Sequence, residues 1–167
     1  MVTLLVLFDF TKAFDTVSHD LLLRKLRSFR LSPSTCQWVR SYLTGRHQRV
    51  RGPDGSFSSW MPVVAGVSVL GPLLFLLFLN DLSSILSHCS HILYADDLQI
   101  YIHFPPADID AALAKVRADI AAIESWAQNN SLILNARKTK FMLLESSKFI
   151  NSIPSSSIQL HLNGTLI

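Results

Sequence analysis

The sequence predicts an α+β fold in which a small, mostly antiparallel sheet carries helices packed mainly on one face. Strand patterns are mixed among helical patterns, turn residues separate at least two pairs of neighbouring strands, and one long amphipathic helix is available to cover a sheet. The 167 residues, of which 49% are hydrophobic, suffice to bury one sizeable core. We therefore expect one principal domain.

The first part of the chain predicts a core strand followed by two helices. Val2 to Phe8 is a continuous apolar run that ends at an acid, which is typical of a buried strand. From His19 to Phe29, leucines alternate with basic residues in a helical pattern. Pro33 separates this helix from a second one over 34–43. The residues of the second helix that are expected to pack inward are Trp38, Val39 and Tyr42.

A hairpin is predicted next, because Gly52-Pro53-Asp54-Gly55 lies between strand candidates at 48–51 and 57–64. Basic residues gather around it. They are Arg40, Arg46, His47, Arg49 and Arg51. The sequence leaves two interpretations of this cluster open, a solvated face and a surface that contacts a phosphate backbone.

A helix is predicted from Pro72 to about Leu86. The uncharged stretch 63–79 approaches the length of a membrane span, but it falls short of one and contains Gly66 and Gly71. We therefore expect a buried helix and no membrane partner. With no targeting signal visible, the expected location is the cytoplasm or the nucleus. Cys36 and Cys89 lack metal-ligand spacing and are expected to be free and packed.

The second half of the chain predicts strands around one long helix. Strands over 92–94 and 98–102 meet at an acidic turn. From Ala107 to Asn129, apolar residues recur with helical spacing, so this helix should cover one face of the sheet. Further short strands are expected at 140–144 and 158–162, separated by a serine-rich linker.

Three carboxylates occur at positions where they could together bind metal ions for a reaction at phosphorus. Asp9 ends the first core strand, while Asp96 and Asp97 form the tip of the hairpin. Hard cations prefer carboxylate oxygens, and two cations about 4 Å apart can serve both the attacking and the leaving oxygen. An acidic pair is more often a polar turn, but apolar flanks make adjacent like charges unfavourable unless a cation or solvent offsets them. The residues alone leave both interpretations open.

Several segments resemble reverse transcriptases of non-LTR, LINE-type retrotransposons. Tyr94-Ala95-Asp96-Asp97 is similar to the hallmark tetrapeptide of the family. Phe8 to Val17, FDFTKAFDTV, resembles its first palm motif. The second palm motif is matched by SVLGPLLF over 68–75, followed by Asn80-Asp81-Leu82, and a later stretch is matched by Trp126, Asn130, Leu132, Leu134, Asn135, Lys138 and Thr139. These segments occur in family order over 3–144.

The resemblance implies a right-hand polymerase palm over residues 1–145, with 146–167 forming a serine-rich linker and the start of a following strand. It implies RNA-directed DNA polymerase activity by two-metal nucleotidyl transfer. The implied cofactor is Mg²⁺, with Mn²⁺ as a substitute. The implied partners are an RNA template, a DNA primer and deoxynucleoside triphosphates.

The resemblance also assigns roles by matched position. Asp9 and Asp96 would be the principal metal ligands, with Asp97 a third acid beside them. Lys138 matches a lysine near the leaving pyrophosphate, where it would donate a proton or neutralise charge. A surface lysine at the start of a strand is the alternative for Lys138.

Three further residues are assigned to the nucleotide and primer. Phe14 matches a ring that lies beneath the incoming sugar and excludes a ribose 2′-hydroxyl, with a plain core aromatic as the alternative. Tyr94 either packs or contacts the primer. Ser68 belongs to the second palm motif and is expected at the nucleotide site.

The second palm motif departs from the family, which usually has Pro-Gln-Gly between the positions of Val67 and Ser68. Three missing residues should shift the start of the following helix by several ångströms, at about 3.3 Å per extended residue. We also expect the fingers and thumb to be largely absent. The sequence thus predicts an impaired polymerase palm, with a catalytically inactive retroelement remnant that binds nucleic acid weakly as the alternative.

Overall fold

The computed structural model describes residues 1–62, 70–145 and 158–167. The chain divides into two compact units. The first contains Met1–Ala13 and Asp81–Ile167, and the second contains Phe14–Asn80. The first unit carries the three predicted carboxylates, and the second carries the predicted basic hairpin. The assignment of 1–145 to one palm domain stays a prediction.

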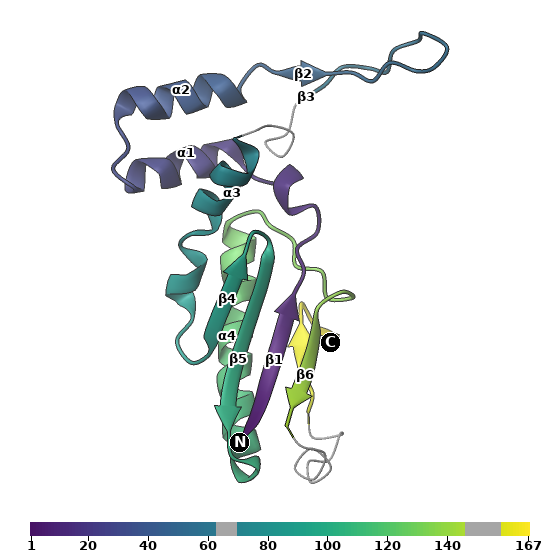
Figure 1. Cartoon of the computed structure of the whole chain (residues 1–167). Helices are drawn as coiled ribbons and strands as arrows, with labels where there is room; N and C mark the ends of the chain where they lie inside the picture. The colour runs from purple at the N-terminus through teal and green to yellow at the C-terminus, as the bar shows by residue number, and fades with distance from the viewer. Residues whose placement is uncertain (63–69, 146–157) are drawn as a thin grey trace. The chain divides into compact units, whose positions relative to one another are not determined.

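The centre of the first unit is a four-stranded antiparallel sheet with the order β4-β5-β1-β6 (Figure 1). Its strands are β1 (Val2–Phe8), β4 (Ser90–Tyr94), β5 (Asp97–Phe104) and β6 (Lys140–Leu144). β1 pairs with β5 from Val2↔Phe104 to Phe8↔Leu98, and with β6 from Thr3↔Leu144 to Leu7↔Lys140. The predicted α+β class and the antiparallel sheet are confirmed.

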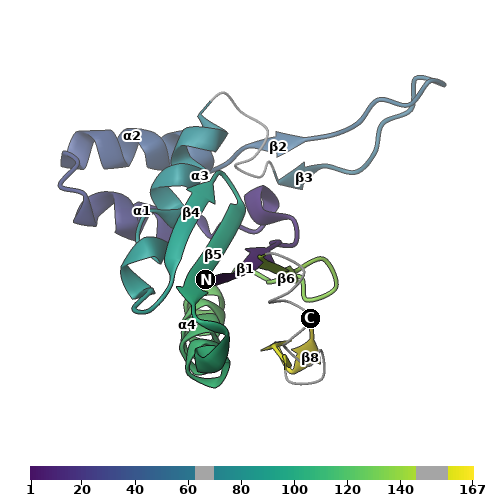
Figure 2. The same ribbon diagram turned by 60° about the horizontal axis from the view of Figure 1, so that its bottom comes forward.

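One face of this sheet is covered by the long helix α4 (Ile109–Asn129), as Figure 2 shows. Side chains alternate between the two faces of a strand. Along β1 the even-numbered residues from Val2 to Phe8 are at most 3% exposed, whereas Thr3, Leu5 and Leu7 are partly exposed. The helix contributes to the same core Ala112, Leu113, Val116, Ile120, Ile123, Trp126 and Ala127. The predicted amphipathic helix is therefore confirmed.

A short C-terminal hairpin packs beside α4. It consists of β7 (His161–Leu162) and β8 (Thr165–Leu166), which form a separate two-stranded sheet. Leu160 and Leu162 are fully buried, and the Arg117 guanidinium donates a hydrogen bond of 2.9 Å to the Gln159 carbonyl. The strand predicted over 158–162 is thus shorter than expected. The predicted serine-rich linker lies outside the described residues.

The second unit consists mainly of helices, two of which begin at a serine cap. They are the 3-10 turn η1 (Ala13–Asp15), which begins in the first unit, and the helices α1 (His19–Ser28), α2 (Pro33–Leu43) and α3 (Gly71–Leu79). The Ser18 and Ser32 hydroxyls accept backbone hydrogen bonds at the starts of α1 and α2, as N-cap residues do. The Lys25 ammonium donates a 2.7 Å hydrogen bond to the Phe78 carbonyl, which fixes α1 against α3. No helix of the described chain has the length and apolar character to cross a membrane.

Two details of the helices differ from the sequence prediction. The helix predicted to reach Leu86 ends at Leu79, and a 3-10 turn, η3 (Leu82–Ile85), follows. η3 packs against α4 with Leu82 fully buried, so tertiary contacts override the helical pattern. Trp38 was expected to pack inward but is 56% exposed. The buried stripe of α2 has helical spacing and consists of Cys36, Val39 and Leu43.

The hairpin between β4 and β5 has a two-residue loop, because Tyr94 pairs with Asp97. The first loop residue, Ala95, has φ of +52°. A positive φ at this position suits the twist of a tight hairpin, and glycine adopts it without strain. For an L residue with a Cβ atom this conformation is unfavourable by roughly 1–2 kcal/mol. The acidic turn therefore stores backbone strain.

A buried carboxylate ties α4 to the segment before β4. Asp119 is 1% exposed and accepts backbone hydrogen bonds from Ser87 and His88, both at 3.1 Å, and from Cys89 at 2.7 Å. Burial alone would raise the pKa of Asp119, but these hydrogen bonds hold the pKa below its ordinary value of 3.8. Burial and the neighbouring Asp119 raise the pKa of the Cys89 thiol to about 12. Cys36 and Cys89 are free and buried, as predicted.

We predict that Asp119→Asn lowers the free energy of unfolding by about 2–3 kcal/mol at pH 7, because the amide leaves buried backbone donors without an acceptor. Urea unfolding measures this. The folded pKa lies below the unfolded one, so the contribution of Asp119 is complete above pH 3.8 and is lost as the pH falls through the folded pKa. The difference in unfolding free energy between the variant and wild type should therefore disappear in acid. Asp110→Asn, at an exposed position of α4, is the control, and a gap independent of pH would contradict the assignment.

We predict that Ala95→Val lowers the free energy of unfolding by roughly 1–2 kcal/mol, since a β-branched side chain at positive φ clashes with the backbone. Ala95→Gly should cause no comparable loss, because glycine adopts this φ freely. Thermal unfolding of both variants measures the difference. Equal destabilisation by valine and glycine would show that the backbone of the turn is not strained.

Candidate active site

The sheet brings two of the predicted acids to the same end of neighbouring strands. Asp9 follows the last residue of β1, and Asp97 is the first residue of β5. Phe8 pairs with Leu98, so the register places Asp9 next to Asp97 one step further along the ladder. The alternation of burial continues through buried Phe10, which directs Asp9 to the face opposite α4.

The hairpin tip presents its polar residues to solvent. Asp96 is the second loop residue and is partly exposed, while Asp97 is exposed. Tyr94 is 79% exposed, so it does not pack in the core. Of the two interpretations of Tyr94, packing in the core is therefore excluded. Contact of Tyr94 with a primer stays a prediction.

The backbone around Asp9 is held by the segment that precedes β6. The Asn135 N–H donates to the Asp9 carbonyl at 2.8 Å, and the Asp9 N–H donates to the Thr139 hydroxyl at 3.3 Å. Phe10 and Leu134 form an isolated antiparallel bridge. Thr139 is fully buried, so its hydroxyl is a fixed acceptor. Contacts with residues distant in sequence therefore fix the backbone position of Asp9.

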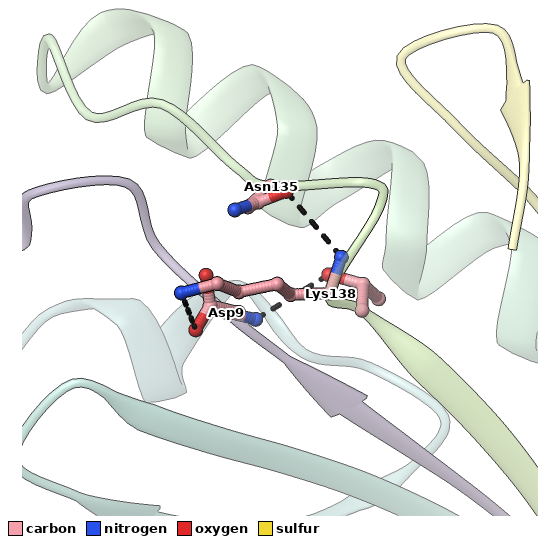
Figure 3. A network of polar contacts seen from close by, with 4 residues as sticks. Asp9, Asn135 and Lys138 are labelled. Carbon is pink, nitrogen blue, oxygen red and sulfur yellow. Dashed lines mark hydrogen bonds and ion pairs between the residues drawn. The ribbon is translucent and has the colours of Figure 1, made fainter.

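Figure 3 shows Lys138 reaching across to the Asp9 side chain. Its ammonium lies 3.8 Å from Asp9 Oδ1. The Lys138 backbone N–H donates to the Asn135 side-chain oxygen at 3.3 Å, which anchors the base of this side chain. The Lys138 side chain is 70% exposed, so solvent screens the ion pair and its contribution to stability is small.

The second carboxylate oxygen of Asp9, Oδ2, is buried and has no hydrogen-bond partner among the residues that the structure describes. A buried acceptor in this situation is unfavourable by about 1–3 kcal/mol. A cation at this oxygen would remove the penalty, and carboxylate oxygens are what Mg²⁺ prefers. The chemistry of Asp9 therefore fits a metal ligand.

Across residues 1–62, 70–145 and 158–167, no three carboxylate, imidazole or thiol side chains gather closely enough to hold a metal ion. Protein sites for Mg²⁺ often use one or two carboxylates together with substrate phosphates and water. Asp9 and the neighbouring Asp97 supply donors of this kind. The predicted ligand set of Asp9, Asp96 and Asp97 is chemically suitable, and its assembly around an ion stays a prediction.

Two predicted site residues lie elsewhere in the chain. Phe14 belongs to the second unit, where its partly exposed ring lies 4.2 Å from the ring of Phe75, centroid to centroid. Its role beneath an incoming sugar stays a prediction. Ser68 lies outside the described residues, as does its junction with Val67, so the predicted lack of Pro-Gln-Gly there stays a prediction.

The roles of Asn135 and Thr139 were not predicted from the sequence. Both belong to the stretch that resembles the family after the hairpin, but no local pattern showed that they hold the backbone of Asp9. The available signal was a threonine directly before a predicted strand. A buried hydroxyl there needs a hydrogen-bond partner from another part of the chain.

The reverse transcriptase (RNA-dependent DNA polymerase) family model matches residues 1–160. A comparison with curated protein sequences finds no match. Among solved structures, apo telomerase from Candida tropicalis truncated from its C-terminal domain aligns with a TM-score of 0.66 at 14% identity, covering 87% of this chain and 31% of that chain. Telomerase from Candida albicans in complex with a TWJ fragment of telomeric RNA gives a TM-score of 0.59 at 12% identity, covering 87% and 27%.

At these identities the likeness to telomerases shows a shared fold, and this chain spans less than a third of the length of either telomerase chain. The family match is broader, since it extends over nearly the whole sequence. The carboxylates at the end of β1 and at the adjoining hairpin tip lie inside the matched region. The chain belongs to the reverse transcriptase (RNA-dependent DNA polymerase) family.

Proposed function

We propose that this chain is the palm of an RNA-directed DNA polymerase of the non-LTR, LINE type, which extends a DNA primer with deoxynucleoside triphosphates. The observation that carries the proposal is the Asp9 carboxylate, which lies at the sheet end that also carries Asp97. Its buried Oδ2 has no hydrogen-bond partner within the described chain. Family membership supports RNA-dependent DNA synthesis as the class of reaction. The stretch from Trp126 to Thr139, which resembles the segment after the catalytic hairpin of LINE-type enzymes, supports the LINE subtype.

In this proposal Asp9, Asp96 and Asp97 hold two Mg²⁺ ions, or Mn²⁺ in their place. The bound metals would lower the charge barrier at the reacting phosphate and favour the ionised primer hydroxyl. Asp9 provides a fixed ligand, since its backbone is held on both sides by the segment before β6. Asp96 and Asp97 lie at an exposed hairpin tip, where they meet solvent and substrate phosphates.

Lys138 is suited to act on the leaving group. Its ammonium lies at the edge of the acidic site, 3.8 Å from Asp9 Oδ1, and its side chain is largely exposed. A lysine in this position would neutralise charge on the departing pyrophosphate or donate a proton to it. Phe14 is proposed to exclude a ribose 2′-hydroxyl, with Tyr94 at the primer and Ser68 at the nucleotide.

A nucleic-acid-binding domain without catalysis is the second candidate. It is favoured by the absence of a three-residue metal cluster among the described residues and by the missing Pro-Gln-Gly segment. A displacement of about 1 Å at a reacting centre lowers a rate roughly 100-fold, so a shift of the second palm motif would suffice to silence the site. The two candidates differ in whether the acids matter for nucleotide incorporation.

We predict that Asp9→Asn lowers template-primed, Mg²⁺-dependent incorporation by at least about 100-fold, because metal stabilisation of the transition state contributes several kcal/mol. Affinity for Mn²⁺, measured by paramagnetic broadening of amide signals at residues 95–97, should fall in the same variant. Asp110→Asn makes the same charge change on α4 and serves as the control. Equal incorporation and equal Mn²⁺ affinity in wild type and Asp9→Asn would reject the polymerase and leave the second candidate.

Insertion of Pro-Gln-Gly between Val67 and Ser68 should raise the rate of incorporation, because it would return the following helix to its family register. A primer-extension time course of the insertion variant against wild type measures this. Insertion of Gly-Gly-Gly at the same place controls for length alone. A rate unchanged by either insertion would contradict this explanation of impaired activity.

A further inference from the structure

A hairpin in the second unit carries arginine side chains on its first half and aromatic side chains on its second half. We define residues 46–62 as the arm. Its base is the pairing of β2 (His47–Gln48) with β3 (Met61–Pro62), and nearer its tip Arg51 and Phe57 form a further bridge. In Figures 1 and 2 the arm extends away from α2, in the same unit. From 49 to 61 every residue except Gly52 is exposed.

The arm arranges its arginines and rings in stacks. The Arg49 guanidinium lies 3.8 Å from the Phe57 ring centroid and 4.6 Å from that of Trp60. At the base, Arg46 lies 4.9 Å from the Tyr42 ring. Phe57 and Trp60 are 50% and 61% exposed, so ring surface stays accessible beside each guanidinium. A guanidinium that stacks through its face keeps its edge N–H groups for other acceptors.

The charge of the arm is one-sided. Three arginines, Arg46, Arg49 and Arg51, accompany one acid, Asp54. The Ser56 hydroxyl and backbone N–H donate to Asp54, which lowers the pKa of this carboxyl and keeps its charge within the turn. No carboxylate in the described part of the chain forms an ion pair with the three arginines. The arm therefore offers positive charge to a partner outside the chain.

We propose that the arm binds single-stranded nucleic acid, with the arginines on phosphates and the exposed rings on bases. Stacking of bases on aromatic side chains along a positively charged track is how proteins hold single strands without reading sequence. His47 and Trp60 lie at a shallow, open part of the surface, and the Trp60 side chain is exposed, so an unstacked base can reach the indole. A duplex keeps its bases stacked on one another, so it would contact only the arginine charges of the arm. This proposal rests on the proposed function in one respect: the bound strand would be the template of the polymerase.

Fluorescence anisotropy of a labelled oligouridylate with the whole chain tests the role of the arginines. For Arg49→Gln/Arg51→Gln we expect weaker binding and a slope of log affinity against log salt reduced by about 1.4, at roughly 0.7 per phosphate contact. Arg24→Gln/Arg27→Gln removes the same charge from exposed positions on α1 and should keep the wild-type slope. Equal slopes for the two double variants would overturn the assignment of phosphate contacts to the arm.

Substitutions at Trp60 test the role of the rings. Trp60→Leu should weaken binding roughly 5- to 150-fold, the range expected for loss of stacking with one base. Trp60→Phe retains a ring and should stay close to wild type. A duplex of the same length should be insensitive to the leucine substitution. Equal affinity of the leucine and phenylalanine variants would overturn base stacking.

The binding readout separates this inference from the proposed function. Asp110→Asn, which removes a charge outside both the acidic site and the arm, should bind the oligonucleotide as wild type does. Normal binding by the arm variants, together with nucleotide incorporation by wild type, would overturn only the proposal for the arm. Loss of binding by the arm variants, together with no incorporation by wild type, would overturn only the polymerase proposal. Arm-dependent binding to phosphatidylserine vesicles, with oligonucleotide binding unaffected by the arm, would assign the arm to lipid and overturn the proposal.

Discussion

The pairing of β1 on both of its edges is the constraint on which the first unit depends. Because β1 lies between β5 and β6, its backbone donors and acceptors are used by both neighbours, and its even-numbered side chains fill the core under α4. Each buried side chain of this size contributes about 1.5–3 kcal/mol. A slip by one residue would expose this whole set and turn Asp9 toward the core. The apolar pattern of the strand therefore also decides where the acid points.

The candidate site uses this rigid sheet and adds local features that are unfavourable for stability. Asp9 has a buried oxygen for which the described part of the chain supplies no hydrogen-bond partner, and Ala95 has a positive φ next to the acidic pair. Strain and unsatisfied polar atoms persist only where the surroundings over-determine them, and they concentrate at functional sites. Here the surroundings are the ladder of β1 and the backbone hydrogen bonds from Asn135 and Thr139. Favourable contacts elsewhere in the unit thus offset the unfavourable local conformation of the site.

Much of the fold was predictable because the signals for it are local. The apolar run of β1, the turn between β4 and β5 and the helical spacing of α4 each lie within one stretch of sequence, and all three elements were placed correctly. Prediction failed where distant contacts decide the outcome. The helix that begins near Pro72 ends early because Leu82 packs under α4, and Trp38 lies outside because a stripe of other residues of α2 is buried.

The same distinction holds for the candidate site. Motif spelling found Asp9, the acidic hairpin and Lys138, and the structure places Lys138 beside Asp9. The Thr139 hydroxyl and the Asn135 backbone were missed as supports of Asp9, since a hydrogen bond to a backbone group far away in sequence leaves no local pattern. Ser68 and the gap beside it lie outside the described residues, so for them the sequence remains the sole source of expectation.

In the proposed function, the two units would contribute differently to the electrostatics of binding a polyanionic substrate. Carboxylates at the end of the sheet repel phosphates, so they favour such a substrate only when cations lie between the two. The arginines of the arm would attract phosphates directly, an effect that weakens as salt concentration rises. Under the two proposals, affinity for nucleic acid and chemistry on it would therefore depend on different ions, monovalent salt for the arm and divalent metal for the acids. A chain that has lost its catalytic geometry would keep the first dependence, which is why binding alone is no measure of polymerase activity.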